Sequence, residues 1–186
     1  MSAPHGLPMF DAVILAGGRA RRMGGIDKPA LEVGGTSLLR RAVDAAGAAT
    51  RIVVVGPQRD LDVAVVWTQE EPPGGGPVAA IAAGLGPVSA AATVVLAADL
   101  PSIDAAAVGA LMSGLGDGDA ALAVDDSGRD QYLCAAYRTE ALRANLTRLP
   151  QLSGAPMHSL VAGLRVARLQ MGASVADIDT PEDLPR

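Results

Sequence analysis

The chain has 186 residues, which suits one domain around a single core and leaves little room for two. Its formal net charge of −5 and its four aromatic residues argue against a nucleic-acid-binding protein, because such proteins neutralise many phosphates and stack bases on aromatic rings. The single cysteine, Cys134, excludes an intrachain disulfide, and no segment reaches the ~18 consecutive apolar residues of a membrane-spanning helix. We therefore expect neither nucleic acid nor a membrane as a partner.

The chain begins with a short segment, residues 1–9, that we interpret as a flexible tail before one domain over residues 10–186. The tail lacks the basic start of a signal peptide, so we expect a cytoplasmic protein. Short β-branched runs then alternate with helical stretches. Strands are expected at residues 11–16, 51–56, 63–68 and 93–98, and helices at residues 37–46, 78–85 and 104–115. Thr36 or Ser37 can cap the first of these helices.

The second half of the chain is less regular. Strands are expected at residues 119–124, 131–137 and 166–171, and helices at residues 139–149 and 157–164. Near the end, Thr180 and Pro181 form a helix-start signal. Continuous apolar character in the early strands predicts burial on both faces, as in a parallel sheet. The order of elements therefore favours an open α/β sheet, in which Cys134 is a small buried apolar residue.

Residues 15–29, which read LAGGRARRMGGIDKP, combine glycines with a cluster of positive charge. A strand ends at Gly17 and Gly18, where the missing side chains let backbone N–H groups approach a ligand closely. Arginines and Lys28 follow, as a bound polyphosphate requires. Lys28 is the only lysine beside fourteen arginines, which indicates that a compact ammonium is needed at this position. The alternative is a plain strand and turn with solvated charges.

Two common phosphate-binding loops do not match this segment. The Walker pattern needs Ser or Thr after its lysine, whereas Lys28 is followed by Pro29. The dinucleotide fingerprint G-x-G-x-x-G is absent at its required spacing, which disfavours a nicotinamide-dependent dehydrogenase. The loop therefore belongs to another kind of nucleotide-binding protein.

An acidic residue, Asp99, follows the apolar run at residues 93–98. Open α/β sheets bind ligands at the carboxyl ends of their strands, which is where Asp99 is expected. A carboxylate at that edge suits Mg²⁺, a hard cation that takes carboxylate and phosphate oxygens. The alternative is that Asp99 only caps the turn before Pro101.

The segment at residues 15–28 resembles the Leu-Ala-Gly-Gly…Arg-Met-Gly…Asp-Lys signature of the MobA-like nucleotidyltransferases, and specifically that of the molybdenum cofactor guanylyltransferases. Further similarities follow in order at Gly75-Gly76-Pro77, at Asp99-Leu100-Pro101 and at residues 179–184. The resemblance implies a single-domain, three-layer Rossmann-like nucleotidyltransferase fold with a mostly parallel central sheet. It also implies Mg²⁺-dependent transfer of GMP from GTP to a molybdopterin-type cofactor, release of pyrophosphate, and transient contacts with other molybdenum cofactor proteins.

The resemblance also assigns roles to residues. The expected catalytic residues are Lys28, Arg22 and Asp99. The residues expected to bind GTP are Leu15, Ala16, Gly17, Gly18, Lys28, Glu71 and Asp99. The expected metal ligands are Asp99 and Asp179. Because the acceptor phosphate is already an anion, in-line attack on the α-phosphorus of GTP needs no Ser–His pair, and the residues show none.

Two of these assignments leave alternatives open. A carboxylate before Gly76-Pro77 can accept hydrogen bonds from guanine N1–H and its 2-amino group; Glu70 and Glu71 both fit, and Glu71 is preferred over Glu70. Asp177 and Asp179 point to the same side of an extended segment, so either can bind metal or orient metal-bound water, or Asp179 can simply cap the last helix.

The sequence departs from the family pattern at several positions. Gly56 stands where the family often has a base-contacting Asn, Ala80 replaces a usual Gly, and Asp177 and Asp179 replace Asn. Alternatives are therefore a cytidylyltransferase with the same pterin, another nucleotidyltransferase with a sugar-phosphate or cobinamide acceptor, and a non-catalytic nucleotide-binding module. All enzymatic readings require Lys28 and Asp99 to share one cleft.

Overall fold

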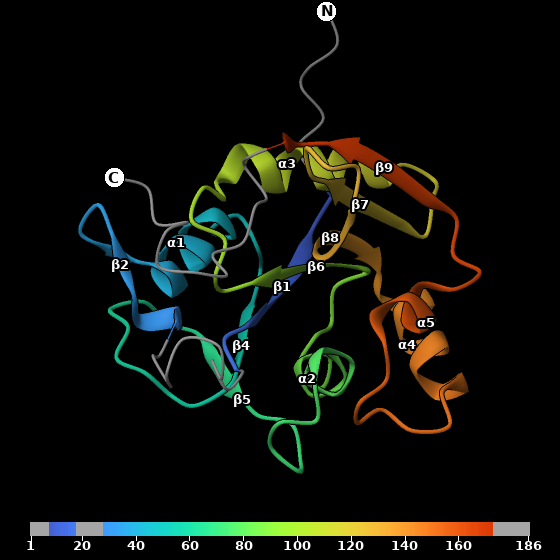
Figure 1. Cartoon of the computed structure of the whole chain (residues 1–186), viewed down its shortest axis with the longest axis horizontal. Coiled ribbons are helices and arrows are strands. Elements are labelled where there is room, and N and C mark those ends of the chain that lie inside the picture. The colour runs from blue at the N-terminus through green and yellow to red at the C-terminus, as the bar shows by residue number, and fades with distance from the viewer. Residues whose placement is uncertain (1–7, 18–27, 173–186) are drawn as a thin grey trace, which may run out of the picture.

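The computed structural model describes residues 8–17 and 28–172 of the chain. Their centre is a seven-stranded sheet with the order β5-β4-β1-β6-β8-β7-β9 (Figure 1). The strands are β1 (Phe10–Leu15), β4 (Ile52–Val55), β5 (Val66–Thr68), β6 (Ala92–Ala97), β7 (Ala120–Val124), β8 (Asp130–Arg138) and β9 (Val166–Gln170). Only β8 runs antiparallel to its neighbours in this sheet, so the predicted mostly parallel α/β architecture is confirmed.

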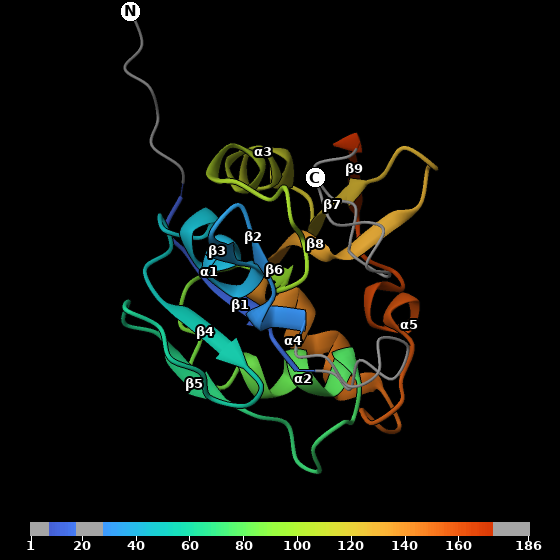
Figure 2. The ribbon, with the colours of Figure 1, turned by 60° about the vertical axis from the view of Figure 1, so that its left-hand side comes forward.

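Helices cover both faces of the sheet, which gives three layers (Figures 1 and 2). The helices are α1 (Leu38–Ala45), α2 (Pro77–Gly84), α3 (Ala105–Leu115), α4 (Thr139–Arg148) and α5 (Met157–Val161). Buried residues of α1 and α3 pack on one face together with Ala12 and Ile14 of β1. Those of α2, α4 and α5 pack on the other face with Val13 and Leu15, because successive strand residues point to opposite sides.

Small residues let α2 approach the sheet closely. At Gly84, an added Cβ would lie 2.4 Å from a methyl carbon of Val13 and 2.9 Å from one of Val55. This close approach explains how a core with so few aromatic rings is filled by Ala, Val, Leu and Ile side chains. Cys134 is buried in this core as expected, and burial raises the pKa of its thiol to about 12. No helix in the described part of the chain is long and apolar enough to cross a bilayer.

Several predicted boundaries are corrected by the structure. The strand expected at residues 63–68 begins at Val66, because it pairs with only the three residues Val53–Val55 of β4. The helix expected at residues 157–164 ends at Val161, and Gly163 follows with a φ of +77° that a continuing helix does not adopt. Ser37 is the N-cap of α1, since its side chain accepts a hydrogen bond from the Arg40 amide at 3.2 Å.

The sequence analysis missed a small hairpin beside α1 (Figure 2). Its strands are β2 (Glu32–Val33) and β3 (Thr36–Ser37), and the short 3₁₀ helix η2 (Lys28–Ala30) precedes it. Gly34 and Gly35 form the turn with φ values of +60° and +78°. A Gly-Gly pair is a common two-residue hairpin turn, so this signal was present in the sequence. The Arg41 guanidinium of α1 donates to the Val33 carbonyl and fixes the hairpin to the helix.

Candidate active site

A cleft lies at the carboxyl ends of β1 and β6. These strands are parallel neighbours in which Leu15 pairs with Ala97, so the residues that follow each strand reach the same edge of the sheet. The cleft has a volume of about 670 Å³. Its lining consists of Leu15, Gly17, Lys28, Pro29, Glu70, Pro73, Gly74, Gly76, Pro77, Ala80, Ala97, Ala98, Asp99 and Leu133. The edge is the one at which open α/β sheets bind ligands.

Lys28 and Asp99 meet in this cleft. The Lys28 Nζ lies 4.0 Å from the Asp99 Oδ2, and the two side chains are 17% and 29% exposed. The shared cleft that every enzymatic reading requires is therefore present. The two groups differ in what they can bind, since an ammonium attracts phosphate oxygens and a carboxylate attracts a hard cation.

Hydrogen bonds with the neighbouring strands fix the backbone that follows β1, where it borders the cleft. The Ala16 amide donates to the Val55 carbonyl at 2.8 Å, and the Ala98 amide donates to the Leu15 carbonyl at 3.0 Å. These bonds fix the segment that ends at Gly17, which is exposed and lines the cleft. A glycine at the cleft wall lets ligand atoms approach its backbone.

Close packing around Gly56 explains why this chain has glycine where the family often has Asn. Its φ is +143°, and an added Cβ would lie 2.8 Å from the Ala16 carbonyl carbon and from the Gly17 nitrogen. A side chain at this position would therefore push the segment Ala16–Gly17 away from β4. In this chain the end of β4 supports the backbone at Ala16 and Gly17 by close packing, and Gly56 offers no side chain to the cleft.

The loop between β5 and α2 brings Glu70 to the cleft. Glu70 is only 9% exposed, and its Oε1 accepts a hydrogen bond from the Gly74 amide at 2.9 Å. The Gly154 amide donates to the Gly75 carbonyl at 2.8 Å and anchors the loop from the α4–α5 side. Glu71, the preferred residue of the pair in the sequence analysis, is exposed and does not line the cleft. Of the two glutamates, Glu70 is therefore the one that lines the cleft.

Four residues with predicted roles lie outside the described residues. They are Gly18, Arg22, Asp177 and Asp179. Their roles in phosphate and metal binding stay predictions. Leu15 and Gly17 line the described cleft, and Ala16 lies between them in the chain.

The cleft also has an apolar wall that the sequence analysis did not identify. Ala97 and Leu133 contribute to it from the neighbouring strands β6 and β8, and Pro77 and Ala80 contribute from α2. Ala80, which stands where the family has Gly, is 8% exposed. Leu133 carried no local signal, since its place depends on how β8 pairs with β6 and β7.

The described residues fit a magnesium site that is completed by substrate. No group of three His, Cys, Asp or Glu side chains suitable for a metal occurs among residues 8–17 and 28–172. Mg²⁺ commonly binds through one or two carboxylates together with phosphate oxygens. The partly exposed Asp99 carboxylate, at the edge of a cleft that also holds an ammonium, is a donor of this kind.

Comparison with known proteins gives the family. The family model of the MobA-like NTP transferase domain matches residues 12–168, most of the chain. The chain belongs to this family. The match includes the carboxyl ends of β1 and β6, which form the cleft, as well as Lys28 and Asp99.

Curated relatives of this MobA-like chain carry a common name. A probable molybdenum cofactor guanylyltransferase of Natronomonas pharaonis is 31% identical over 191 residues, with 94% of each chain covered. A second, from Opitutus terrae, is 32% identical over 187 residues, with 93% of this chain and 92% of the relative covered.

Solved structures show the same fold. Molybdopterin-guanine dinucleotide biosynthesis protein A from Archaeoglobus fulgidus superposes with a TM-score of 0.71 at 22% identity and 94% coverage of both chains. The 2-C-methyl-D-erythritol 4-phosphate cytidylyltransferase from Thermus thermophilus gives 0.72 at 21% identity, with 93% and 94% covered. The MobA-like chain thus shares its architecture with both a molybdopterin-guanine dinucleotide biosynthesis protein and a cytidylyltransferase.

Proposed function

We propose that this MobA-like protein transfers GMP from GTP to a molybdopterin-type cofactor and releases pyrophosphate. The observation that carries the proposal is the single cleft in which Lys28, Asp99 and the backbone at Gly17 converge. The names of the full-length relatives, molybdenum cofactor guanylyltransferase, support the same substrates. The fold alone would not distinguish guanylyl from cytidylyl transfer, because the T. thermophilus cytidylyltransferase shares it.

The triphosphate is proposed to lie along the edge between β1 and β6. The amide-bearing backbone at Gly17 approaches the phosphates, and the Lys28 ammonium offsets the negative charge that grows on the leaving pyrophosphate. Arg22, in the segment between them, adds positive charge in this proposal. Catalysis then consists of positioning and charge neutralisation rather than covalent chemistry with the protein.

The guanine base is proposed to contact Glu70. A carboxylate offers two oxygens to the N1–H and 2-amino donors of guanine, an edge that adenine and cytosine lack. The Gly74 amide holds Oε1 of Glu70 in place and leaves further lone pairs for the base, since each carboxylate oxygen can accept more than one hydrogen bond. Replacement by Gln would set an amide donor against guanine donors, so Glu70→Gln should raise the KM for GTP more strongly than Glu71→Gln does.

The reaction is a single displacement at phosphorus. A phosphate oxygen of the acceptor forms a bond to the α-phosphorus of GTP. The bond from that phosphorus to the α–β bridging oxygen breaks, and pyrophosphate leaves with the electron pair. No proton has to move from the acceptor, because its phosphate is anionic at neutral pH. The absence of a Ser–His pair around the described cleft residues is consistent with this chemistry.

Magnesium is part of the proposal, with Asp99 as its protein ligand. Bound Mg²⁺ would neutralise charge on the phosphates and orient the α-phosphate. The Asp99 carboxylate, whose Oδ2 lies 4.0 Å from the Lys28 Nζ, would hold the cation in the cleft. Asp179, or Asp177, is retained as the second carboxylate of the proposal.

The experiment that tests the function measures pyrophosphate release with each of four nucleoside triphosphates. Molybdopterin, a sugar phosphate and cobinamide phosphate serve in turn as acceptors, with and without Mg²⁺. We expect turnover with GTP and molybdopterin only in the presence of Mg²⁺. Turnover with CTP in preference to GTP would replace the guanylyltransferase by a cytidylyltransferase. Tight GTP binding without turnover on any acceptor would favour a binding module.

A further inference from the structure

Strand β8 contains a bulge of three residues next to the cleft. Leu122 of β7 pairs with Ala135 of β8, but the next residue, Ala123, pairs with Gln131. Residues 132–134 of β8 therefore have no partners on β7, although Cys134 still pairs with Leu96 of β6. Bulges re-aim side chains and are frequent beside active sites. This one carries Leu133, which lines the cleft.

A buried hydroxyl closes the bulge. The Tyr137 hydroxyl donates to the Tyr132 carbonyl at 2.8 Å, and Tyr137 is fully buried. Burial raises the pKa of the Tyr137 phenol, so the hydroxyl keeps its proton and remains a donor throughout the physiological range. The bond links residues five positions apart on the same strand across the unpaired segment.

The bulge lies at the end of the cleft away from Glu70. The Glu70 loop follows β5, which lies on one side of the β1–β6 pair in the sheet. Strand β8 lies on the other side of this pair, next to β6. Because β8 runs antiparallel to β6, its first residues lie beside the end of β6, where Ala98 and Asp99 follow. Leu133 is therefore next to the Asp99 side of the cleft, and in the order of the strands Asp99, after β6, lies between Leu133 and the Glu70 loop, after β5.

We propose that Leu133 contacts the acceptor and that Tyr137 is a positioning residue that holds Leu133 there through the bulge. The inference rests on the proposed function, in which the base takes the Glu70 end and the triphosphate takes the middle of the cleft. The acceptor has to approach the α-phosphorus from the remaining end. The wall formed there by Leu133 and Ala97 is apolar, so it suits the ring system of a phosphate-bearing heterocycle rather than its phosphate.

The test compares Tyr137→Phe and Leu133→Ala with the wild-type protein in steady-state GMP transfer and in calorimetric titrations with GTP and with molybdopterin. Leu133→Ala should raise the KM and the Kd for molybdopterin on the order of tenfold. Tyr137→Phe should raise the KM and the Kd for molybdopterin about fivefold, because the residues of the bulge are kept but the hydrogen bond to the Tyr132 carbonyl is lost. The Kd for GTP should be unchanged in both variants. Leu133→Met, which keeps the apolar volume, should restore acceptor binding.

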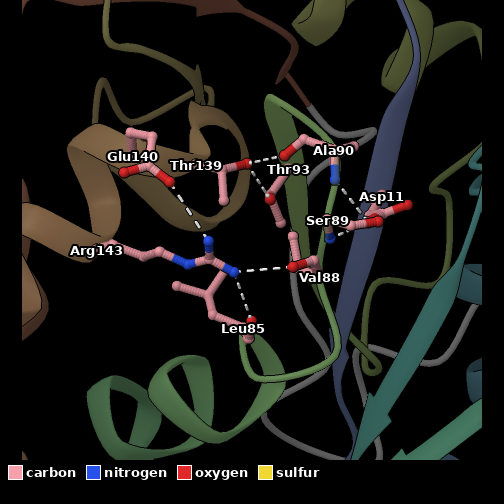
Figure 3. A network of polar contacts seen from close by, with 9 residues as sticks. All are labelled: Asp11, Leu85, Val88, Ser89, Ala90, Thr93, Thr139, Glu140 and Arg143. Atoms are coloured by element: carbon pink, nitrogen blue, oxygen red, sulfur yellow. Dashed lines mark hydrogen bonds and ion pairs between the residues drawn. The ribbon is translucent and has the colours of Figure 1, made fainter.

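A matched control separates positioning from general loss of stability. Thr93→Val removes another buried hydroxyl bond of the same sheet, the 2.8 Å contact between the Thr93 and Thr139 hydroxyls near the amino end of β6 (Figure 3). It should lower the melting temperature about as much as Tyr137→Phe does and leave the molybdopterin KM and Kd unaltered.

The outcomes distinguish this inference from the proposed function. A Tyr137→Phe protein with wild-type molybdopterin affinity overturns the positioning role, and an equal rise in the GTP Kd shows that the whole cleft is disturbed instead. If the wild-type protein binds molybdopterin but transfers no GMP, the proposed function fails while the titrations still decide the inference. If it binds no molybdopterin at all, both are overturned.

Discussion

The two edges of the central sheet use the same residue type in opposite ways. At the amino edge, Asp11 of β1 is fully buried, and its Oδ2 accepts hydrogen bonds from the Ser89 amide at 2.8 Å and the Ala90 amide at 3.0 Å (Figure 3). At the carboxyl edge, Asp99 lies 29% exposed in the cleft within 4.0 Å of Lys28. The Asp11 carboxylate binds backbone amides and stabilises the fold, whereas the Asp99 carboxylate lines a cleft that a ligand can fill.

The amino edge is built around the turn between α2 and β6. The Thr139 hydroxyl donates to the Ala90 carbonyl at 2.7 Å, and Arg143 donates to the carbonyls of Leu85 at 3.0 Å and Val88 at 2.8 Å (Figure 3). The comparison separates these two aspartates: burial and two backbone donors give Asp11 a structural role, whereas Asp99 is partly exposed beside a cation in a cleft, as functional carboxylates often are. Substitutions at the two edges should therefore separate activity from stability.

The largest effect is expected at the carboxyl edge. Lys28→Ala and Asp99→Asn should each lower kcat/KM for GMP transfer by at least about 100-fold, because each removes a charge that the proposed function assigns to the phosphates or to their metal ion. The melting temperature should stay close to that of the wild type. Asp117→Asn, at an exposed position, is the control and should retain full activity. Near-normal turnover of Lys28→Ala would contradict the assignment of this lysine.

The converse effect is expected at Asp11. Asp11→Ala leaves the two amides of Ser89 and Ala90 without their acceptor and should lower the free energy of unfolding by about 2–4 kcal/mol. Chemical denaturation measures this loss, and the Kd for GTP below the melting temperature should be unchanged. The exposed Asp62→Ala should change the unfolding free energy by less than about 0.5 kcal/mol. A stable Asp11→Ala protein with weakened GTP binding would reverse the comparison.

A smaller loss of stability is expected at Arg143. Arg143→Met keeps the apolar stem but removes the donors to the Leu85 and Val88 carbonyls, so the unfolding free energy should fall by about 1 kcal/mol. The partly exposed guanidinium limits the effect, since water can replace it. A loss as large as that of Asp11→Ala would show that the turn depends on the arginine rather than on the aspartate.

The smallest effect concerns an exposed pair near the same edge. Arg165 donates to Asp119, just before β7, and these hydrogen bonds lower the carboxyl pKa to about 2 from 3.8. A depressed pKa adds stability above pH ~4 that is lost as the pH falls towards 2. Asp119→Asn should therefore be slightly less stable than wild type at pH 7, and the difference should shrink on acidification. A difference that grows below pH 4 would contradict this sign.

The sequence predicted, from local signals, that Lys28 and Asp99 share one cleft. Lys28 and Asp99 follow apolar runs that form neighbouring parallel strands, so their convergence follows from the architecture. The choice between Glu70 and Glu71 could not be made in this way, because it depends on a loop closed by the Gly74 amide and anchored by Gly154. Leu133 was missed for a related reason, since its bulge results from pairing with two other strands.

The same holds for the fold: features with a local sequence pattern were predicted, and features that depend on distant contacts were not. Continuous apolar runs predicted the parallel strands, because a strand that is buried on both faces is apolar at nearly every position. The insertion of β8 between β6 and β7 depends on contacts between distant parts of the chain, and local pattern does not encode it. The short extent of β5 likewise reflects the length of β4, its partner in the part of the chain that the structure describes.

The solitary lysine has a practical consequence. Because Lys28 carries the one side-chain amine of the chain and lies in the cleft, reductive methylation with ¹³C-formaldehyde would place a single side-chain label at the phosphate side. Its methyl resonance in an NMR spectrum would report nucleotide entry directly and without assignment of the protein. The chain thus carries one lysine through which a ligand in the cleft can be detected.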